Sequence, residues 1–132
     1  MTVNRLRRIL TVLLGLYFAL DALWMLADPM NWYYRAGVAF TGSANVHFIR
    51  DLGCAFLVAA ASLLWFAKSP LRAWPAALAG VSFLVLHAFV HLWDTVAGRE
   101  TYQHLLAHEL LAVLVPALLG VWIVWNPDRA ST

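Results

Sequence analysis

The sequence contains few of the residues on which soluble folds and soluble active sites depend. Charged residues make up 12% of its 132 residues, whereas soluble domains carry about a quarter, and 63% of the residues are hydrophobic. The net charge is only +2 and the arginines are scattered, which argues against a nucleic-acid-binding surface. A single cysteine excludes an intrachain disulfide and a thiolate framework for structural zinc. This composition predicts a membrane protein.

Common catalytic motifs are also missing. The sequence has no Gly-rich phosphate loop, no serine nucleophile elbow and no cysteine nucleophile with a matched base. It has no low-complexity tract and no obvious internal repeat. What it does have is a series of long apolar runs that are interrupted by histidines and carboxylates.

Four apolar runs are long enough to cross a membrane, which takes about 20 residues of helix. They cover residues 8–27, 46–67, 74–97 and 101–125. Pro29 closes the first run, Ser43 or Asn45 caps the second, and Gly98 ends the third. Pro116 lies inside the fourth run and predicts a kink there. The predicted fold class is therefore all-α, a polytopic membrane protein whose single domain, residues 1–132, is a bundle of four transmembrane helices.

Basic residues in the flanks of the runs predict the orientation. One side carries Arg5, Arg7, Arg8, Lys68, Arg72 and Arg129, and the other carries Arg35, Arg50 and Arg99. Because positively charged flanks stay in the cytoplasm, both termini should lie there, with the connection 28–45 on the outer side. The predicted location is the bacterial inner membrane. The aromatic residues Trp32, Tyr33 and Tyr34 of that connection suit an interfacial belt or a short helix on the membrane surface.

Ionisable side chains recur at one depth, about 8–10 Å below the outer end of each run at a rise of ~1.5 Å per residue. Each run contributes one of them: Asp21, Asp51, His91 and His108. Nearer the outer surface lie His47, Asp94 and His104, while His87 lies deeper and Glu109 lies about 100° around the helix from His108. A charge near the centre of a span costs about 2.5–3.5 kcal/mol, so such groups normally face the bundle interior.

The spacing of these side chains predicts a metal site. Pairs of them are four residues apart, as in His-x-x-x-His, and therefore share one helix face. The predicted primary ligands are His87, His91, His108 and Asp51, with His47, His104, Asp94, Asp21 and Glu109 as further ligands or as their hydrogen-bonding partners. Mixed histidine and carboxylate sets favour zinc or non-haem iron, and the number of ligands leaves room for two ions. The implied function is a metal-dependent redox or hydrolytic reaction in which a metal-bound water reacts.

Three alternatives stay open for the same residues. A haem b needs two opposed imidazoles, for example those of His91 and His108, although its apolar ring suits the neighbouring carboxylates poorly. A non-enzymatic carrier of protons or metal ions, or an accessory subunit, would use the polar groups as a relay. A structural plug would only fix the packing of the helices. Arg50 either pairs with Asp51 or Glu109, or binds an anionic or carbonyl-bearing substrate from the outer leaflet.

The stretches "RILTVLLGLYFALDALWMLADP" and "NVHFIRDLGCAFLVAAASLLW", with an Arg-x-x-Gly element formed by Arg50 and Gly53, resemble small bacterial membrane proteins of the DoxX-like kind. The resemblance covers roughly the first half of the chain. It implies the four-helix fold and a quinone-linked oxidoreductase role, with a quinone or lipid-like molecule as the partner. The bilayer is the other expected partner. Apolar helix faces are expected in lipid, so they do not tell whether the protein forms oligomers.

Overall fold

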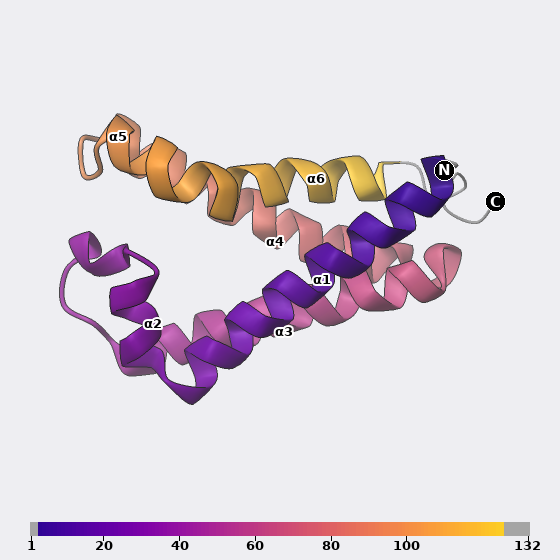
Figure 1. The fold of residues 1–132 in the computed structure, drawn as a ribbon, viewed down its shortest axis with the longest axis horizontal. Coiled ribbons are helices and arrows are strands. Elements are labelled where there is room, and N and C mark those ends of the chain that lie inside the picture. Colours follow the sequence, from indigo (N-terminus) through magenta and orange to yellow (C-terminus); the bar gives the residue numbers. More distant parts are fainter. Residues whose placement is uncertain (1–2, 126–132) are drawn as a thin grey trace.

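The computed structural model describes residues 3–125 and contains four long helical segments (Figure 1). The first three are α1 (Val3–Ala27), α3 (Val46–Lys68) and α4 (Pro70–Val96), and the fourth is the continuous series α5 (Tyr102–His104), η2 (Leu105–Leu114) and α6 (Val115–Val124). A short α2 (Pro29–Arg35) and η1 (Val38–Thr41) connect α1 to α3. All four long segments are sufficiently long and apolar to cross a membrane. The predicted all-α, four-helix membrane bundle is confirmed.

The predicted helix bounds agree with the observed ones to within a few residues, with one informative error. The third run was expected to begin at 74, with Pro75 in its first turn, but α4 begins at Pro70. Pro70 itself occupies the tolerated first position of the helix, and Pro75 lies inside it. The short link between α3 and α4 is thus the single residue Ser69, which holds the two helices side by side.

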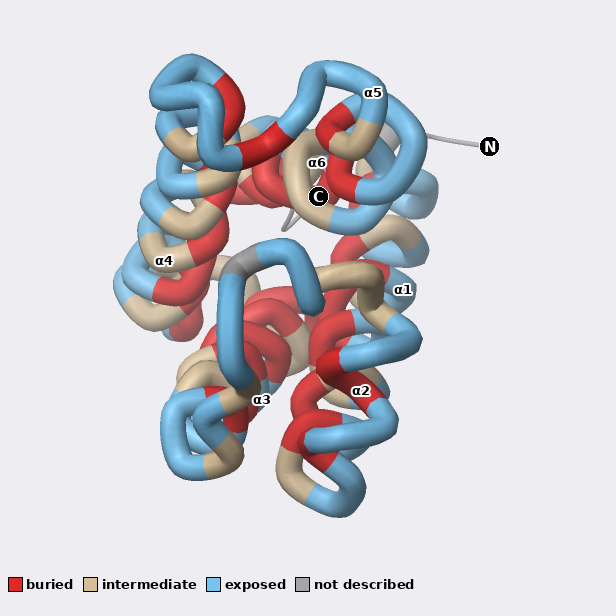
Figure 2. Tube along the Cα trace, turned by 90° about the vertical axis from the view of Figure 1, so that its left-hand side faces the viewer, coloured by how far each residue is buried: buried red, intermediate tan, exposed pale blue. Residues whose placement is uncertain are grey.

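The helices pack in the order α1, α3, α4 and α6, with the closest association between α1 and α3 and little contact between α1 and α6 (Figures 1 and 2). Small residues allow the close approaches. A Cβ atom at Gly80 would lie 2.4 Å from Ser62 Oγ and 3.1 Å from Ala59 Cα, so α3 and α4 are almost in backbone contact. Such small residues are typical of helix contacts in lipid, where burial of apolar area drives association only weakly.

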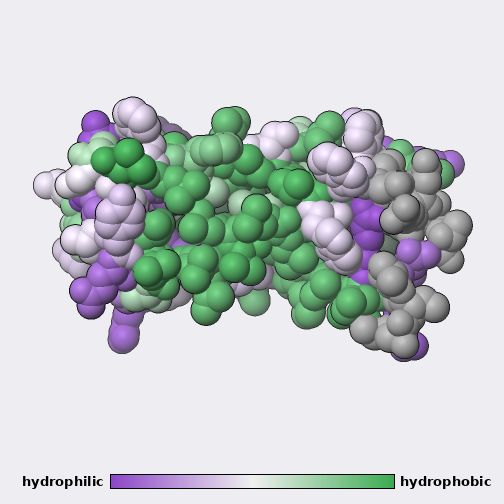
Figure 3. Space-filling model, turned by 90° about the horizontal axis from the view of Figure 1, so that it is seen from above, coloured by the Kyte–Doolittle hydropathy of each residue, from purple (hydrophilic) through white to green (hydrophobic). Residues whose placement is uncertain are grey.

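The outer surface of the bundle has the pattern expected in a bilayer. Figure 3 shows an apolar band across the middle of the viewed face, with polar residues gathered towards both ends. Large apolar side chains such as Leu20, Leu86 and Leu118 point away from the bundle. Two apolar grooves, one between α1 and α6 and one of about 470 Å³ between α4 and α6, are lined by none of the predicted ligands.

The end of the bundle that carries the start of α1 and the end of α6 is closed by polar contacts. The guanidinium of Arg7 donates to the carbonyl of Ile123, and the indole of Trp74 donates to the carbonyl of Val124 at 2.9 Å. These carbonyls belong to the last turn of α6, where the backbone carbonyls have no amide donor within the helix. Arg7, expected only as a flanking charge, is therefore buried at a helix end.

At the opposite end, α2 folds back onto α1. Asp28 caps α2 by accepting from the Asn31 amide at 3.2 Å, and the indole of Trp32 donates to Asp21 Oδ1 at 2.8 Å. The hydroxyl of Tyr33 donates to the carbonyls of Ala39 and Gly42. Trp32 and Tyr33 are consequently buried, and of the three aromatic residues expected in an interfacial belt only Tyr34 is exposed.

Pro116 changes the helix type of the fourth segment. The ten residues of η2 before it form a π-helix, and α-helical geometry begins at Val115. Proline cannot donate to the Ala112 carbonyl four residues earlier, and the hydroxyl of Tyr17 on α1 donates to that carbonyl at 3.2 Å. Where the sequence predicted a kink, the structure has a π-helix, a rare element that occurs frequently at functional sites.

Candidate metal site

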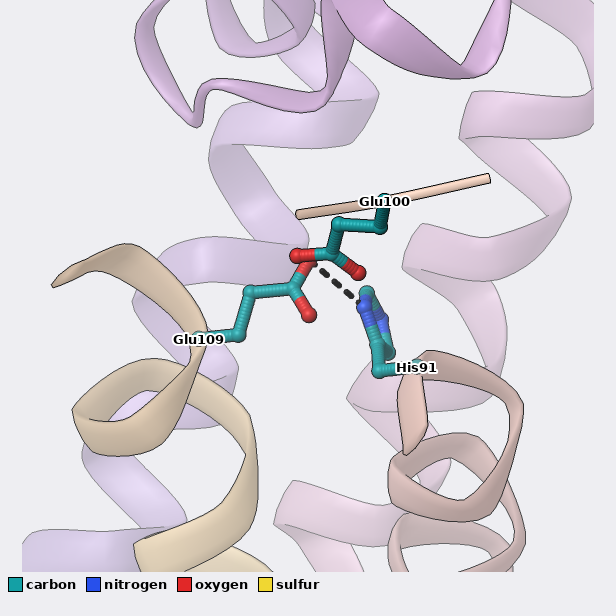
Figure 4. Close-up of side chains that lie close together, drawn as sticks. All are labelled: His91, Glu100 and Glu109. Carbon is teal, nitrogen blue, oxygen red and sulfur yellow. Dashed lines mark ion pairs between the residues drawn. The ribbon is translucent and has the colours of Figure 1, made fainter. Parts of the chain in front are cut away.

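A histidine and two glutamates converge between α4 and η2 (Figure 4). His91 Nδ1 on α4 lies 2.7 Å from Glu109 Oε1 on η2. Glu100, from the connection between α4 and α5, places its carboxyl group beside both. One potential ligand atom from each residue lies within 4.8 Å of the other two. Among residues 3–125, this is the set that brings three potential ligands together.

Glu100 reaches the site because of the way in which α4 ends. Gly98 has φ +72°, its amide donates to the carbonyl of Thr95 at 3.1 Å, and the Arg99 amide donates to the carbonyl of Asp94 at 2.9 Å. This pair of bonds is the Schellman motif, which needs a left-handed residue and usually glycine. The reversed chain then directs Glu100 inward, and only 7% of this residue is exposed.

Glu109 reaches the site on the buried face of η2. Along this segment the two buried residues, Leu105 and Glu109, are four residues apart. Glu109 is only 4% exposed, whereas its neighbour His108 is exposed. Glu109 and His108 therefore lie on different faces of the fourth segment, as their separation around the helix predicted.

A second histidine lies behind the first. His87 Nε2 is 3.1 Å from His91 Nε2, and the His87 ring packs edge-on against Phe56 and stacks on Phe83. With Nδ1 of His91 directed at Glu109 and Nε2 directed at His87, both nitrogens of the central imidazole have partners. A metal-ligating histidine is typically oriented in this way through its second nitrogen.

The electrostatics of the group call for a positive charge or a proton. Glu100 Oε1 and Glu109 Oε2 are both buried and have no hydrogen-bond partner. The other Glu100 oxygen accepts from the hydroxyl of Thr95 at 3.4 Å. Burial, followed by the proximity of Glu109, raises the pKa of Glu100. The raised pKa means that Glu100 holds a proton to a higher pH than an exposed glutamate does.

The same geometry fits a divalent ion. Carboxylate and imidazole ligands lie about 2.0–2.2 Å from zinc, so two ligand atoms on one ion are at most about 4.2 Å apart. Around a tetrahedral ion the ligand atoms are about 3.4 Å apart, so the widest separations in the group, up to 4.8 Å, would have to close by up to about 1.4 Å. Two buried carboxylates would then balance the charge of the ion.

The other predicted ligands are engaged elsewhere. His47 Nε2 lies 3.4 Å from Asp51 Oδ2, and these side chains are 89% and 62% exposed, so Asp51 lies on an outer face rather than in the interior as expected. Asp21 accepts from Trp32, and Asp94 pairs with Arg99 at 2.9 Å. The prediction used only the depth of each group, but rotation about each helix axis decides which groups meet, and depth does not fix rotation.

Arg50, the predicted substrate-binding residue, also has an internal partner. Its Nε donates to the carbonyl of Leu26 at 3.3 Å, in the last turn of α1. A basic side chain at a helix C-terminus satisfies a carbonyl that has no intrahelical donor. Cys54 is exposed.

His104 and His108 form a separate pair near the start of the fourth helical segment. Their rings are stacked, with centroids 4.6 Å apart, and the His104 ring packs edge-on against Phe40 of η1. His104 Nε2 lies 4.0 Å from Glu100 Oε1. The haem b alternative placed the imidazoles of His91 and His108 opposite each other. In the structure His108 instead stacks on His104.

Glu100 was not among the predicted ligands because it lies between two spans, in a connection whose pattern indicated only the end of a helix. A signal for it was present. Glu100 precedes His104 and His108 at successive intervals of four residues, so it continues the face of the fourth helix by one turn.

Comparison of the chain with protein-family models, curated proteins and solved structures gave no match. The resemblance to DoxX-like proteins therefore stays a prediction. Function has to be inferred from the geometry of the site itself.

Proposed function

We propose that the protein is an integral membrane protein that binds a divalent transition metal through His91, Glu100 and Glu109. The single observation that carries this proposal is the juxtaposition of two buried carboxylates, each with an unpartnered oxygen, around one imidazole. Burying two acids together is costly unless a cation or a proton compensates them. An ion at this point provides that compensation and leaves the helix packing as it is.

Zinc and non-haem iron suit the site best. One imidazole nitrogen and two carboxylate oxygens form a borderline-to-hard ligand set, which disfavours copper(I). Three protein ligands leave a position for water, the pattern of catalytic rather than structural zinc sites. A metal-bound water has a strongly lowered pKa and becomes a nucleophile near neutral pH. We therefore favour metal-dependent hydrolysis, or redox chemistry if the ion is iron, at the outer end of a bacterial inner-membrane protein.

His91 would act as a ligand and as a link to His87. Its Nδ1 lies 2.7 Å from Glu109 Oε1. With an ion bound, Nδ1 would become the ligand and Nε2 would carry the proton and donate to His87 Nε2, now 3.1 Å away. Metal binding thus requires no movement of the His87–His91 contact.

Proton binding is the second candidate function, favoured by the raised pKa of Glu100. An acid pair that shares a proton, joined to two hydrogen-bonded histidines, has the components of a relay. The stacking of His108 on His104 gives no support to the haem b alternative, which needs His108 opposite His91.

Metal titration of the purified protein tests the proposal. The protein in mild detergent is stripped with a chelator, titrated with Zn²⁺ or Co²⁺, and assayed for bound metal and for its absorption spectrum. We expect the native chain to bind the metal tightly. The variants Glu109→Gln and His91→Ala each remove a ligand, so their metal affinity should fall by much more than the roughly 10–100-fold that is typical of losing an outer-shell partner. Co²⁺ should give d–d bands in the native chain only.

A matched control is Asp94→Asn. It removes a carboxylate from α4, one turn from His91, but this carboxylate pairs with Arg99 and does not belong to the group. Its metal binding should equal that of the native chain. Absence of metal binding at pH 7, together with release of a proton from the Glu100–Glu109 pair on alkalinisation, would favour the relay; a Soret band would favour haem.

A further inference from the structure

The group of His91, Glu109 and Glu100 is closed to its surroundings. Their side chains are 16%, 6% and 1% exposed, respectively. The two apolar grooves on the sides of the bundle are lined by none of the three residues. An ion therefore reaches the group only when an element that covers it moves.

The segment of residues 37–42, which contains η1, lies over this end of the bundle. In the end-on view of Figure 2, the connection between α2 and α3 crosses the middle of the bundle end. The ring of Phe40 packs edge-on against His104, with centroids 4.7 Å apart. On its other side, Nε2 of His104 lies 4.0 Å from Glu100 Oε1. His104 thus connects η1 with the buried group.

A glycine stands at each end of η1. Gly37 has φ +77° and Gly42 has φ +115°, conformations that residues with a side chain rarely adopt. A Cβ atom at Gly42 would meet nothing within 4 Å, so the backbone conformation requires this glycine and close packing does not. Hinges are formed by a few loop residues that absorb large changes in φ and ψ. The two glycines are placed to act as such hinges.

The contacts that hold η1 in place are few. It packs chiefly on α2, where the hydroxyl of Tyr33 contacts the carbonyls of Ala39 and Gly42. It reaches the fourth helical segment through Phe40 and His104. The helices α4 and η2, in contrast, pack against each other directly. Movement of η1 therefore breaks fewer contacts than separation of these helices, and such segments open first.

We propose that residues 37–42 form a lid over the metal site, that the lid opens about Gly37 and Gly42, and that ions enter from the water at this end of the bundle rather than from the bilayer. This inference rests on the proposed function, because it concerns access to the same three ligands. The lid contains none of these ligands and closes over the empty and the loaded site alike. It should therefore control the rates of metal binding and release and leave the affinity unchanged.

The reaction of a buried thiol measures opening of the lid without any metal. Glu100→Cys in a Cys54→Ser background places a single cysteine beneath the lid, where a water-soluble thiol reagent labels it in proportion to the open fraction. Phe40→Ala removes the ring that contacts His104, and Tyr33→Phe removes the hydroxyl that holds the lid. Each change should accelerate labelling by about 2–10-fold, the factor that corresponds to one aromatic contact or one hydrogen bond.

The matched controls are Tyr34→Phe and Phe48→Ala. Both alter exposed aromatic residues, on α2 and α3, and Tyr34→Phe keeps the ring that contacts Tyr33. Labelling in these variants should proceed at the rate of the parent protein. Thermal unfolding of every variant identifies any acceleration that comes from loss of the fold rather than from opening of the lid.

Metal exchange connects the lid with the proposed function. The chain with all three ligands is loaded with Zn²⁺ in detergent, transfer of the ion to a chromophoric chelator gives the release rate, and competition with the same chelator gives the affinity. Phe40→Ala should accelerate binding and release by one common factor of about 2–10, with the affinity of the native chain.

Each failure has its own result. Unchanged labelling in both Phe40→Ala and Tyr33→Phe would overturn the lid, whether or not metal binds. Faster labelling in a chain that binds no metal would keep the lid over this group and overturn the proposed function. Weaker affinity in Phe40→Ala at an unchanged labelling rate would make Phe40 part of the structure of the site, and would also contradict the lid.

Discussion

The position of Glu100 shows how much a single side chain outside the membrane spans contributes to the site. Without it, His91 and Glu109 form an ordinary buried pair, at 2.7 Å, that needs nothing further. The second buried carboxylate changes the balance, because one imidazolium cannot neutralise two acids. The site therefore has an excess of negative charge, which a bound cation or a proton would neutralise.

At the same scale, His87 should control the affinity of the metal site without being a ligand. Its Nε2 contacts the imidazole of His91, and its ring is held between Phe56 and Phe83. We expect His87→Phe to weaken metal binding by about 10–100-fold, the typical cost of losing an outer-shell partner, with the number of bound ions unchanged. Competition with a chromophoric chelator measures this change. A loss of stoichiometry would instead make His87 a ligand, as the spacing of His87 and His91 first suggested.

Gly98 connects the residue scale with the scale of the elements, because it turns the chain so that Glu100 points inward. Replacement by alanine at φ +72° should cost roughly 1–2 kcal/mol, the penalty of a left-handed non-glycine residue. Gly98→Ala should therefore lower the unfolding temperature and weaken metal binding together. Gly98→Asn is the rescue variant, since asparagine tolerates this conformation better. If Gly98→Ala binds metal as tightly as the native chain, the Schellman turn is not what positions Glu100.

The π-helix before Pro116 should serve function at the expense of stability. A proline inside a helix costs about 3 kcal/mol, and Pro116→Ala restores a backbone donor to the Ala112 carbonyl. A return to α-helical geometry would rotate Leu105–Leu114 relative to α6 and turn Glu109 away from His91. We expect Pro116→Ala to raise the unfolding temperature and to weaken metal binding.

The prediction for Pro116→Ala is specific because stability should rise while metal affinity falls. Tyr17→Phe is the companion variant, because it removes only the donor to the Ala112 carbonyl and leaves the proline in place. It should lower stability slightly and change metal binding little. A Pro116→Ala protein that gains stability and binds metal normally would show that the π-helix does not position Glu109.

The elements themselves were largely predictable from the sequence, because hydropathy and helix punctuation are local properties. Four apolar runs gave four helices, Asn45 caps α3 by accepting from the Phe48 amide, and Gly98 ends α4. The candidate site was less predictable. Rotation about each helix axis depends on packing against neighbours, so Asp51 could be assigned a depth but not a direction. A π-helix and a Schellman turn, which bring in Glu109 and Glu100, leave no simple periodic signal.

For the whole molecule, the polar groups are distributed unequally between the two ends of the bundle. The site, the short helix α2 and the exposed pair of His47 and Asp51 gather at one end (Figure 1). At the other end lie the buried Arg7 and the link between α3 and α4, with Lys68 and Arg72. The basic residues should face the cytoplasm, which would open the metal site to the outer compartment.

This orientation can be tested with single cysteines in a Cys54→Ser background. Ser43 lies in the exposed connection before α3 and Arg72 is exposed near the start of α4, so Ser43→Cys and Arg72→Cys report opposite ends of the bundle. In intact spheroplasts a membrane-impermeant thiol reagent should label Ser43→Cys only, and after permeabilisation it should label both. The reverse pattern would place His91, Glu100 and Glu109 near the cytoplasm. The metal would then come from the intracellular pool, where free zinc and iron are tightly buffered, and the site would have to bind correspondingly more tightly to be occupied.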